Sequence, residues 1–347
     1  MITIHTIDAH AAGEPLRLIV SGFPAVEGGT ILEQREFVRE HYDHLRRALM
    51  LEPRGHADMY GALLTPPEHP GSHAGVLFMH NEGFSTMCGH GVIAVTTIAI
   101  ERGLIVVPPD PDGSIRLTLD APAGPIRSVG RGFASATPES APATPPSRPA
   151  PSVSFTNVPS FVLHPAVPVR AGTRQVRADV AFGGAFYAIV DSEAAGIPIV
   201  PERLPDLRRV GMEIKHAVEK AVTVAHPLQP QLHGIYGTIF TGPPSDERAD
   251  LRNVTIFADA EVDRSPCGTG TAAVMAVLAA MGMLGEGGQV FTHESIIGTK
   301  FRGRIASRTT IGEVDAISPE IEGEAYITGE HTFIIDEDDP LRWGFRI

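Results

Sequence analysis

Two cysteines, Cys88 and Cys267, are the only ones in the chain, and each opens a similar segment. CGHGVIAV (88–95) and CGTGTAAV (267–274) agree at five of eight positions. The same offset of 179 residues places Gly103 on Gly282, so both helix-length runs end on a glycine at the same distance from their cysteine. This repetition indicates an internal duplication that would put equivalent thiols on the two sides of one ligand cleft.

The position of these cysteines suggests a particular chemistry. Each precedes a Gly-x-Gly and a predicted helix, so the free N–H groups and the positive dipole of the first helical turn point at the turn. Such a site suits a carboxylate, and it favours a thiolate over a thiol. One thiol could then take a proton from the α-carbon of an amino acid while backbone donors stabilise the enolate-like charge. This half reaction needs no cofactor, and we expect none.

Other uses of the same residues are less well supported. A free cysteine is often a small core residue, but two matched settings argue against that interpretation here. A zinc site would need more ligands than Cys88 and His90 supply, so no metal is expected. Gly89, Gly91 and Ala94 match a dinucleotide fingerprint weakly, but a polar stretch precedes them where that motif requires an apolar strand.

The elements that must position the cysteines are short strands and a few helices. Residues 2–20 predict a hairpin that turns at Gly-Glu-Pro, and residues 32–50 predict an amphipathic helix that stops before Pro53. The cysteine helix is expected over 89–102, closed by Gly103. Strands are predicted at 62–65, 75–79, 153–161, 176–182, 186–190, 233–241 and 254–258, and a further helix at 204–224.

Length and composition indicate a soluble globular protein of about two domains for its 347 residues. It carries 28 Lys+Arg against 41 Asp+Glu, a formal charge of −13 that disfavours nucleic acid and anionic membranes as partners. No export signal precedes the first strand, so we predict a cytoplasmic protein with reduced thiols. Residues 134–152 hold six prolines and predict an extended loop or insertion.

Two segments carry a family resemblance. MCGHG (87–91) and DRSPCGTGT (263–271) resemble the two signature motifs of the proline racemase superfamily. Further similar segments are HAAGEPLR (10–17), EPRGHADMYGA (52–62), HNEGFSTMCGH (80–90), GGAFYA (183–188), YGTIF (236–240) and DEDDPLRWGF (336–345). The resemblance implies an α+β fold of two pseudo-symmetric α/β domains of the diaminopimelate epimerase type, with the active site in the cleft between them.

The expected domains follow from this resemblance and from the proline-rich segment. Residues 1–133 would form an N-terminal α/β domain that carries Cys88, with residues 330–347 packing back on it. Residues 153–329 would form a C-terminal α/β domain that carries Cys267.

The superfamily contains proline racemases, 4-hydroxyproline 2-epimerases and trans-3-hydroxy-L-proline dehydratases. The segments around residues 52–62, 80–90, 183–188 and 336–345 resemble the dehydratases more than the epimerases, so the resemblance implies dehydration to a pyrroline-2-carboxylate. The dehydratases typically have threonine where this chain has Cys267, and a cysteine pair is the racemase and epimerase pattern. Racemase or epimerase activity with Cys88 and Cys267 as a two-base pair is therefore the alternative.

The family's binding residues are carried over position by position. Its carboxylate contacts fall on Gly89 and His90 after the first thiol and on Gly268 and Thr269 after the second. Asp263 matches the acidic residue that contacts the ring nitrogen. The partner implied is a small imino acid, and a homodimer stays open. Two alternatives from other classes remain, a nicotinamide-dependent oxidoreductase and a non-catalytic imino-acid-binding protein.

Overall fold

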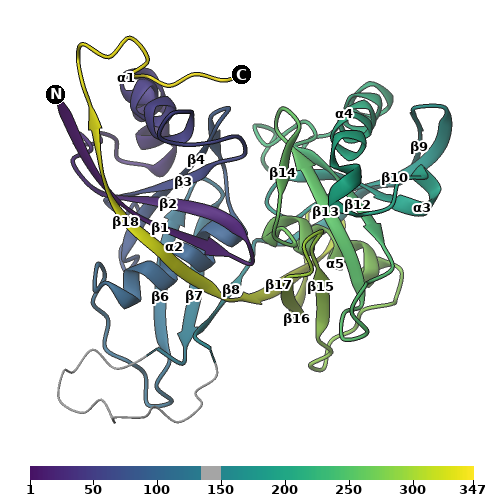
Figure 1. Ribbon diagram of the computed structural model, residues 1–347. Coiled ribbons are helices and arrows are strands. Elements are labelled where there is room, and N and C mark those ends of the chain that lie inside the picture. The colour runs from purple at the N-terminus through teal and green to yellow at the C-terminus, as the bar shows by residue number, and fades with distance from the viewer. Residues whose placement is uncertain (134–149) are drawn as a thin grey trace.

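The protein has a mixed α/β fold rich in β-sheet, and its two halves lie side by side (Figure 1). The computed structural model describes residues 1–133 and 150–347, so most of the predicted proline-rich segment lies outside the described residues. Within those ranges, 18 strands join in one hydrogen-bonded network. The α+β class expected from the sequence is confirmed at this level.

The first half holds eight strands and two helices, and the last strand of the chain returns to it. Its elements are β1 (Ile2–Ala11), β2 (Glu14–Ser21), α1 (Ile31–Met50), β3 (Tyr60–Thr65), β4 (Ala74–His80), β5 (Phe84–Ser85), α2 (Gly89–Glu101), β6 (Ile115–Ala121), β7 (Gly124–Arg131), β8 (Ser152–Thr156) and β18 (Ala325–Ile335).

The second half holds the remaining elements. They are β9 (Ser160–Ala171), β10 (Arg174–Phe182), β11 (Phe186–Asp191), α3 (Ser192–Ala195), a 3₁₀ turn (Pro201–Arg203), α4 (Leu204–Ala221), β12 (Gly237–Gly242), β13 (Leu251–Phe257), β14 (Glu261–Asp263), α5 (Gly268–Ala280), β15 (Phe291–Glu294), β16 (Lys300–Ile311) and β17 (Val314–Gly323).

Strand pairing follows the same order in both halves. From β1 to β8 the pairs are β1–β2 antiparallel, β2–β3 parallel, β3–β4 and β4–β5 antiparallel, β4–β6 parallel, then β6–β7 and β7–β8 antiparallel. From β10 to β17 the same seven directions recur. In the two series, α1 follows β2 and α4, after the short α3, follows the equivalent β11, while α2 follows β5 and α5 follows the equivalent β14. The repeat seen in the cysteine segments therefore extends to the topology.

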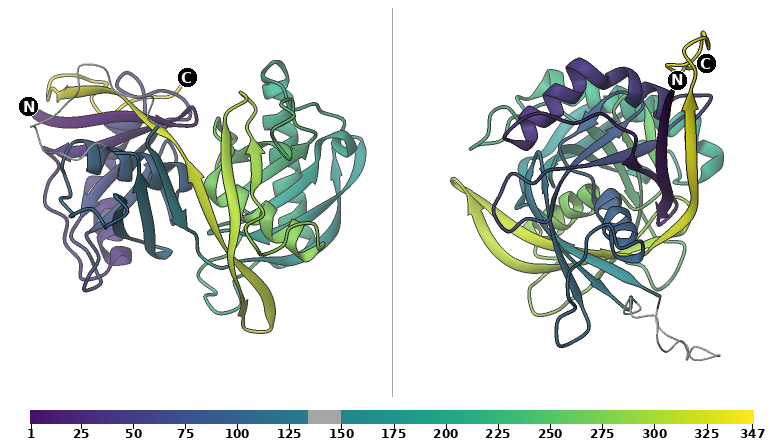
Figure 2. Two further views of the ribbon diagram at one scale, coloured as in Figure 1. Left: turned by 90° about the horizontal axis from the view of Figure 1, so that it is seen from below. Right: turned by 90° about the vertical axis from the view of Figure 1, so that its left-hand side faces the viewer.

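Helices α2 and α5 lie at the centre, with strands wrapped around them (Figure 2). Both are apolar on nearly all sides, which is typical of helices buried in a core. Residues of both helices belong to one buried cluster that spans the two halves. Helices α1 and α4 are instead amphipathic, and each buries one face in a separate apolar cluster, α1 in the first half and α4 in the second.

The halves are joined by strands that pair across the boundary. Strand β8 pairs with β7 on one side and with β17 on the other. Strand β18 pairs with β1 along its whole length, and Trp343 packs against the core under α1. The C-terminal segment thus lies against the first half (Figure 1).

Most predicted elements are confirmed, including the helices at 32–50, 89–102 and 204–224, with small shifts at their ends. The first hairpin is also confirmed, but its turn is wrong. Ala12 and Gly13 form the turn with φ of 51° and 94°, and Glu14 already lies in β2. The strand expected from 233 begins only at Gly237. No helix in the described ranges is long and apolar enough to cross a membrane.

Candidate active site

Each cysteine caps the helix that follows it. The Cys88 Sγ accepts a hydrogen bond from the Gly91 N–H at 3.2 Å, and the Cys267 Sγ accepts one from the Gly270 N–H at 3.3 Å. Both thiols are buried. The positive ends of α2 and α5 therefore point at the two sulfur atoms, as the sequence predicts.

The two helix ends meet in the middle of the molecule. A Cβ added to Gly89 would lie 2.5 Å from the Gly268 Cα, and the reverse substitution would make the same clash. Only glycine allows this approach of the two backbones. Around this contact lies one pocket, lined by Tyr60, Met87, Cys88, Gly89, His90, Tyr187, Tyr236, Phe257, Asp263, Cys267, Gly268 and Thr269. All seven residues proposed from the sequence thus line the same pocket.

The free volume of this thiol pocket is small. It measures about 20 Å³, which holds roughly one water molecule and no proline-sized ligand. The structure therefore represents a closed form, and a ligand can enter only after the halves or the pocket side chains move.

The surroundings of Cys88 are aromatic and polar. The Cys88 Sγ lies 3.3 Å from Nδ1 of His90. The His90 ring packs edge-on against Tyr60, with 4.7 Å between ring centroids. Burial lowers the pKa of His90 to about 3, helped by the positive charge of Arg264, so the imidazole is neutral at physiological pH.

The surroundings of Cys267 are hydroxyl-rich. The Tyr187 hydroxyl lies 2.7 Å from Oγ1 of Thr269 and 3.8 Å from the Cys267 Sγ. On the other side, Ser265 accepts a hydrogen bond from the Cys267 N–H and donates one to Asp263. This chain of bonds connects the backbone N–H of Cys267 to the carboxylate expected to bind the ring nitrogen.

The thiol pKa values correct the sequence analysis. Burial raises the pKa of Cys88 well above its ordinary value, and burial with the charge of Asp263 raises the pKa of Cys267 to about 12. The N–H groups at the helix ends lower both pKa values, but in the closed pocket desolvation is the larger effect. The expected preference for thiolates is therefore wrong for this form. A cationic group bound in the pocket would lower both values.

Two buried carboxyl groups lie close together near the second thiol. Burial raises the pKa of Asp263, and burial followed by the charge of Asp263 raises the pKa of Glu14. Glu14 comes from the first half and accepts a hydrogen bond from the Arg264 N–H at 2.7 Å. Asp263 accepts both the N–H and the hydroxyl of Ser265 on one oxygen, Oδ1.

Several pocket residues were not selected from the sequence. Tyr60, Tyr187, Tyr236 and Phe257 all line the pocket. Tyr60 stacks on His80 and Tyr236 on Phe257, each pair with 5.5 Å between ring centroids. The available signal was the family resemblance, because DMYGA contains Tyr60 and GGAFYA contains Tyr187.

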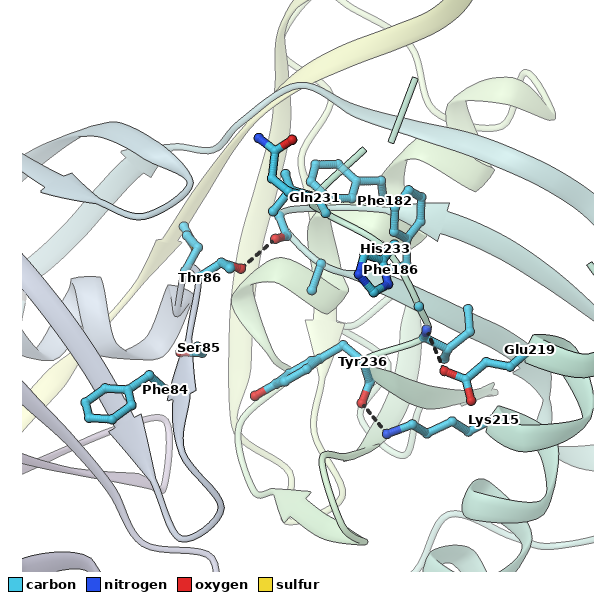
Figure 3. A pocket seen from close by; sticks show the side chains of 16 residues that line it. Phe84, Ser85, Thr86, Phe182, Phe186, Lys215, Glu219, Gln231, His233 and Tyr236 are labelled. Atoms are coloured by element: carbon cyan, nitrogen blue, oxygen red, sulfur yellow. Dashed lines mark hydrogen bonds between the residues drawn. The ribbon is translucent and has the colours of Figure 1, made fainter. Parts of the chain in front are cut away.

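A larger cavity of about 420 Å³ adjoins the thiol pocket. The two share Met87 and Tyr236 as walls. Figure 3 shows Phe84, Ser85 and Thr86 of the first half on one side and Phe182, Phe186 and His233 of the second half on the other. His233 lines this cavity and not the thiol pocket.

Hydrogen bonds between the halves hold this closed form. Asp58 forms an ion pair with Arg208 of α4 and accepts a bond from the Val262 N–H. The Thr86 hydroxyl donates to the Gly184 carbonyl at 3.3 Å (Figure 3). The Thr299 hydroxyl donates to the Ala12 carbonyl at 2.7 Å. The turn at Ala12 thus contributes to the contact between the halves.

Fold and site together define a protein that holds two buried thiols at facing helix ends around one small pocket. Among the residues that the structure describes, no group of three or more His, Cys, Asp and Glu side chains could hold a metal ion. Residues 6–346 match the proline racemase family, and the chain belongs to that family.

Relatives across the family resemble the chain over nearly its full length. It is 47% identical to a Bacillus thuringiensis subsp. konkukian protein named trans-3-hydroxy-L-proline dehydratase, over 99% of this chain and 97% of that protein. It is 43% identical to a Burkholderia multivorans protein named 3-hydroxyproline 2-epimerase, over 99% of this chain and 98% of that protein. Its fold is similar to a hydroxyproline epimerase from Agrobacterium vitis with bound trans-4-hydroxy-L-proline, with a TM-score of 0.87 and 29% identity, covering 100% and 95% of the two chains.

Proposed function

We propose that this protein dehydrates trans-3-hydroxy-L-proline to a pyrroline-2-carboxylate without a cofactor. The observation that carries the proposal is the pair of thiols, Cys88 and Cys267, lining one pocket at the ends of two helices. The full-length relative named as this dehydratase, at 47% identity, supports the choice of substrate.

The architecture we propose is two pseudo-symmetric α/β domains of the diaminopimelate epimerase type. The recurring order of strand pairs and the equivalent cysteine helices support it. Residues 1–133, with the C-terminal residues from about 330, would form one domain, and residues 153–329 the other. Strands β8 and β18 would then cross between them.

Binding would use both helix ends at once. The N–H groups after the thiols, at Gly89 and His90 and at Gly268 and Thr269, would hold the carboxylate by hydrogen bonds and by the helix dipoles. Asp263 would attract the cationic ring nitrogen. The positive charge of that nitrogen would lower the thiol pKa values that burial has raised.

The elimination follows from the stereochemistry of the substrate. In trans-3-hydroxy-L-proline the hydroxyl lies opposite the carboxylate, so the α-hydrogen and the hydroxyl share one face of the ring. Cys88, as thiolate, would remove the α-proton and then return it to the leaving hydroxyl as water. The electrons of the broken Cα–H bond form the Cα=C3 double bond, and the enamine tautomerises to the pyrroline. No redox partner is required.

The alternative is a proline racemase or a hydroxyproline 2-epimerase. The specific observation in its favour is Cys267, a second thiol in a setting that suits an acid on the opposite face of the ring. The relative named 3-hydroxyproline 2-epimerase, at 43% identity, also supports this alternative.

One experiment separates these activities. The protein is incubated in D₂O separately with trans-3-hydroxy-L-proline, trans-4-hydroxy-L-proline and L-proline, and the products are followed by NMR. Pyrroline from the first substrate alone supports the dehydratase. Deuterium at an inverted α-carbon with the other two, and no pyrroline from the first, would replace it by the racemase or epimerase.

A further inference from the structure

Two hydroxyl groups beside Cys88 have no part in the reaction as described above. The Tyr60 hydroxyl donates a hydrogen bond to the Ser85 Oγ at 2.6 Å. Both residues are buried, with 3% and 5% of their surface exposed. Tyr60 begins β3 and Ser85 ends β5, so both come from the half of the molecule that carries Cys88. Of the two, Tyr60 lines the thiol pocket.

The Tyr60 ring is held in place on two sides. It stacks on His80 at 24° between ring planes and meets the edge of His90 at 78°. A ring packed in this way presents its hydroxyl at one fixed place. Burial raises the pKa of Tyr60, so the phenol keeps its proton and acts as a donor at neutral pH.

The substrate has one polar group left without a partner. In the proposed function the helix ends take the carboxylate, Asp263 takes the ring nitrogen and Cys88 takes the α-proton. The 3-hydroxyl lies on the same ring face as the α-hydrogen, so its partner must lie on the Cys88 side of the pocket. The Tyr187 hydroxyl is 3.8 Å from the Cys267 Sγ and therefore belongs to the opposite side.

We propose that Tyr60, supported by Ser85, binds the 3-hydroxyl of the substrate and selects for a ring hydroxylated at that carbon. This rests on the proposed function. Both groups are hydroxyls, so Ser85 can donate to the Tyr60 oxygen while Tyr60 donates to the substrate oxygen. The bond would strengthen as the C3–O bond breaks and charge grows on the oxygen. Tyr60 keeps its own proton, because the proton that completes the water is the one Cys88 took from Cα.

The test measures how the deprotonated substrate is partitioned. With trans-3-hydroxy-L-proline in D₂O, the deprotonated substrate either loses its hydroxyl to give pyrroline or is reprotonated at Cα. Deuterium at Cα of the recovered substrate or of its epimer records reprotonation after the thiol proton has exchanged with solvent. In Tyr60→Phe we expect kcat/KM for pyrroline formation to fall about 10²-fold, as for loss of one aimed donor. The ratio of deuterium incorporation to elimination should rise at least about tenfold, because proton removal persists while hydroxyl departure is impaired. Ser85→Ala should shift the ratio in the same direction by less.

The matched control is Tyr187→Phe, which removes the same hydroxyl from the Cys267 side of the pocket. It should not raise the ratio of exchange to elimination above the wild-type value. Tyr236 is a poorer control, because its hydroxyl points across toward the segment that carries Phe84 and Ser85 (Figure 3).

The possible results separate the role of Tyr60 from the proposed function. The role of Tyr60 is overturned if folded Tyr60→Phe keeps the wild-type ratio of exchange to elimination, or if Tyr187→Phe shifts that ratio equally. If Tyr60→Phe does not fold, an unchanged ratio in Ser85→Ala overturns the role instead. A wild-type protein that forms no pyrroline contradicts the proposed function instead. In that case Tyr60→Phe must still slow α-exchange of trans-3-hydroxy-L-proline more than that of L-proline, and equal slowing overturns the hydroxyl contact.

Discussion

Cys88 and Cys267 begin helices of the same length, 13 residues each, and their sulfur atoms accept the same type of bond from the amide three residues later. Their backbones differ. Cys88 is extended, with φ of −145°, whereas Cys267 has φ of 62°, a value that residues other than glycine seldom adopt. The Ser265 hydroxyl accepts a bond from the Cys267 N–H and donates one to Asp263, and these two bonds hold this second turn in place.

The neighbours of the two thiols differ as well. Two residues after Cys88 stands His90, a neutral imidazole 3.3 Å from the sulfur. Two residues after Cys267 stands Thr269, whose hydroxyl lies 3.7 Å from the sulfur. The duplication thus places a helix N-terminus beside each thiol, but the side chains next to the two sulfur atoms differ.

This difference indicates a division of labour. A frame repeated in both halves suits the carboxylate, which needs N–H donors from both helix ends. Unequal neighbours suit two thiols with different tasks. We assign the α-proton and the leaving hydroxyl to Cys88, and the opposite face of the ring, used only when the α-carbon is inverted, to Cys267.

The largest expected effect separates these two roles. Cys88→Ser should lower both dehydration and racemisation by about 10²–10⁴-fold, the range that a positioned acid or base contributes. Cys267→Ser should lower racemisation of L-proline by a similar factor and dehydration by less than about tenfold. Pyrroline formation and α-deuteration, measured by NMR on the same preparations, give both numbers. A Cys267→Ser protein that loses both activities equally would contradict the division.

The pH dependence sharpens the comparison on the Cys267 side. Burial raises the pKa of Asp263, so this carboxyl takes up a proton nearer to neutral pH than an exposed aspartate does. Only its ionised form attracts the cationic ring nitrogen. We therefore expect kcat/KM to fall about tenfold per pH unit below the raised pKa of Asp263. His90, with a pKa of about 3, stays neutral through this range and adds no inflection.

Two variants check the origin of this acid limb. Asp263→Asn should abolish it and leave a low kcat/KM that is flat at acid pH. Cys267→Ser should retain it for dehydration. An acid limb that survives in Asp263→Asn would assign the titration to another group.

A steric test should show that the two halves are equally sensitive to an added Cβ where their helix ends meet. Gly89 and Gly268 clash with each other's backbone as soon as either gains a Cβ. Gly89→Ala and Gly268→Ala should therefore lower the free energy of unfolding by similar amounts, about 1–3 kcal/mol each, as for overpacking in a core. Gly83→Ala is the control, because its Cβ would meet nothing within 4 Å. Denaturant unfolding measures the free energy of unfolding of all three variants. A large difference between Gly89→Ala and Gly268→Ala would mean that the backbone of only one half shifts to make room for the added Cβ.

The chemistry-bearing residues could be predicted because they are consecutive in the sequence. Cys88 with Gly89 and His90, and Cys267 with Gly268 and Thr269, each occupy a single helical turn, so local rules place their N–H groups and sulfur atoms together. The duplication then predicts that the two turns face each other. The apolar runs after both cysteines likewise predict two buried helices.

The remaining site residues could not be derived in this way. Tyr60 and Tyr187 come from different strands, and only the strand pairing brings their hydroxyls to the pocket. The thiol pKa values depend on how completely the two halves cover the sulfur atoms, which no local pattern reports. The role of Asp58 could not be derived either, because only the packing of the two halves buries it and pairs it with Arg208.

The smallest effect concerns the hydroxyl beside Cys267. Tyr187→Phe removes the 2.7 Å bond to Thr269 and leaves that buried hydroxyl with one partner fewer. The loss of one such bond should cost about 1 kcal/mol, and a chain of this size should then unfold about 1–2 °C lower. Racemisation should slow a few-fold, because the acid on the Cys267 face is less well oriented, while dehydration should not change. Calorimetry and deuterium exchange measure these effects, and a Tyr187→Phe protein that slows dehydration as much as racemisation would show that both ring faces depend on the Cys267 side.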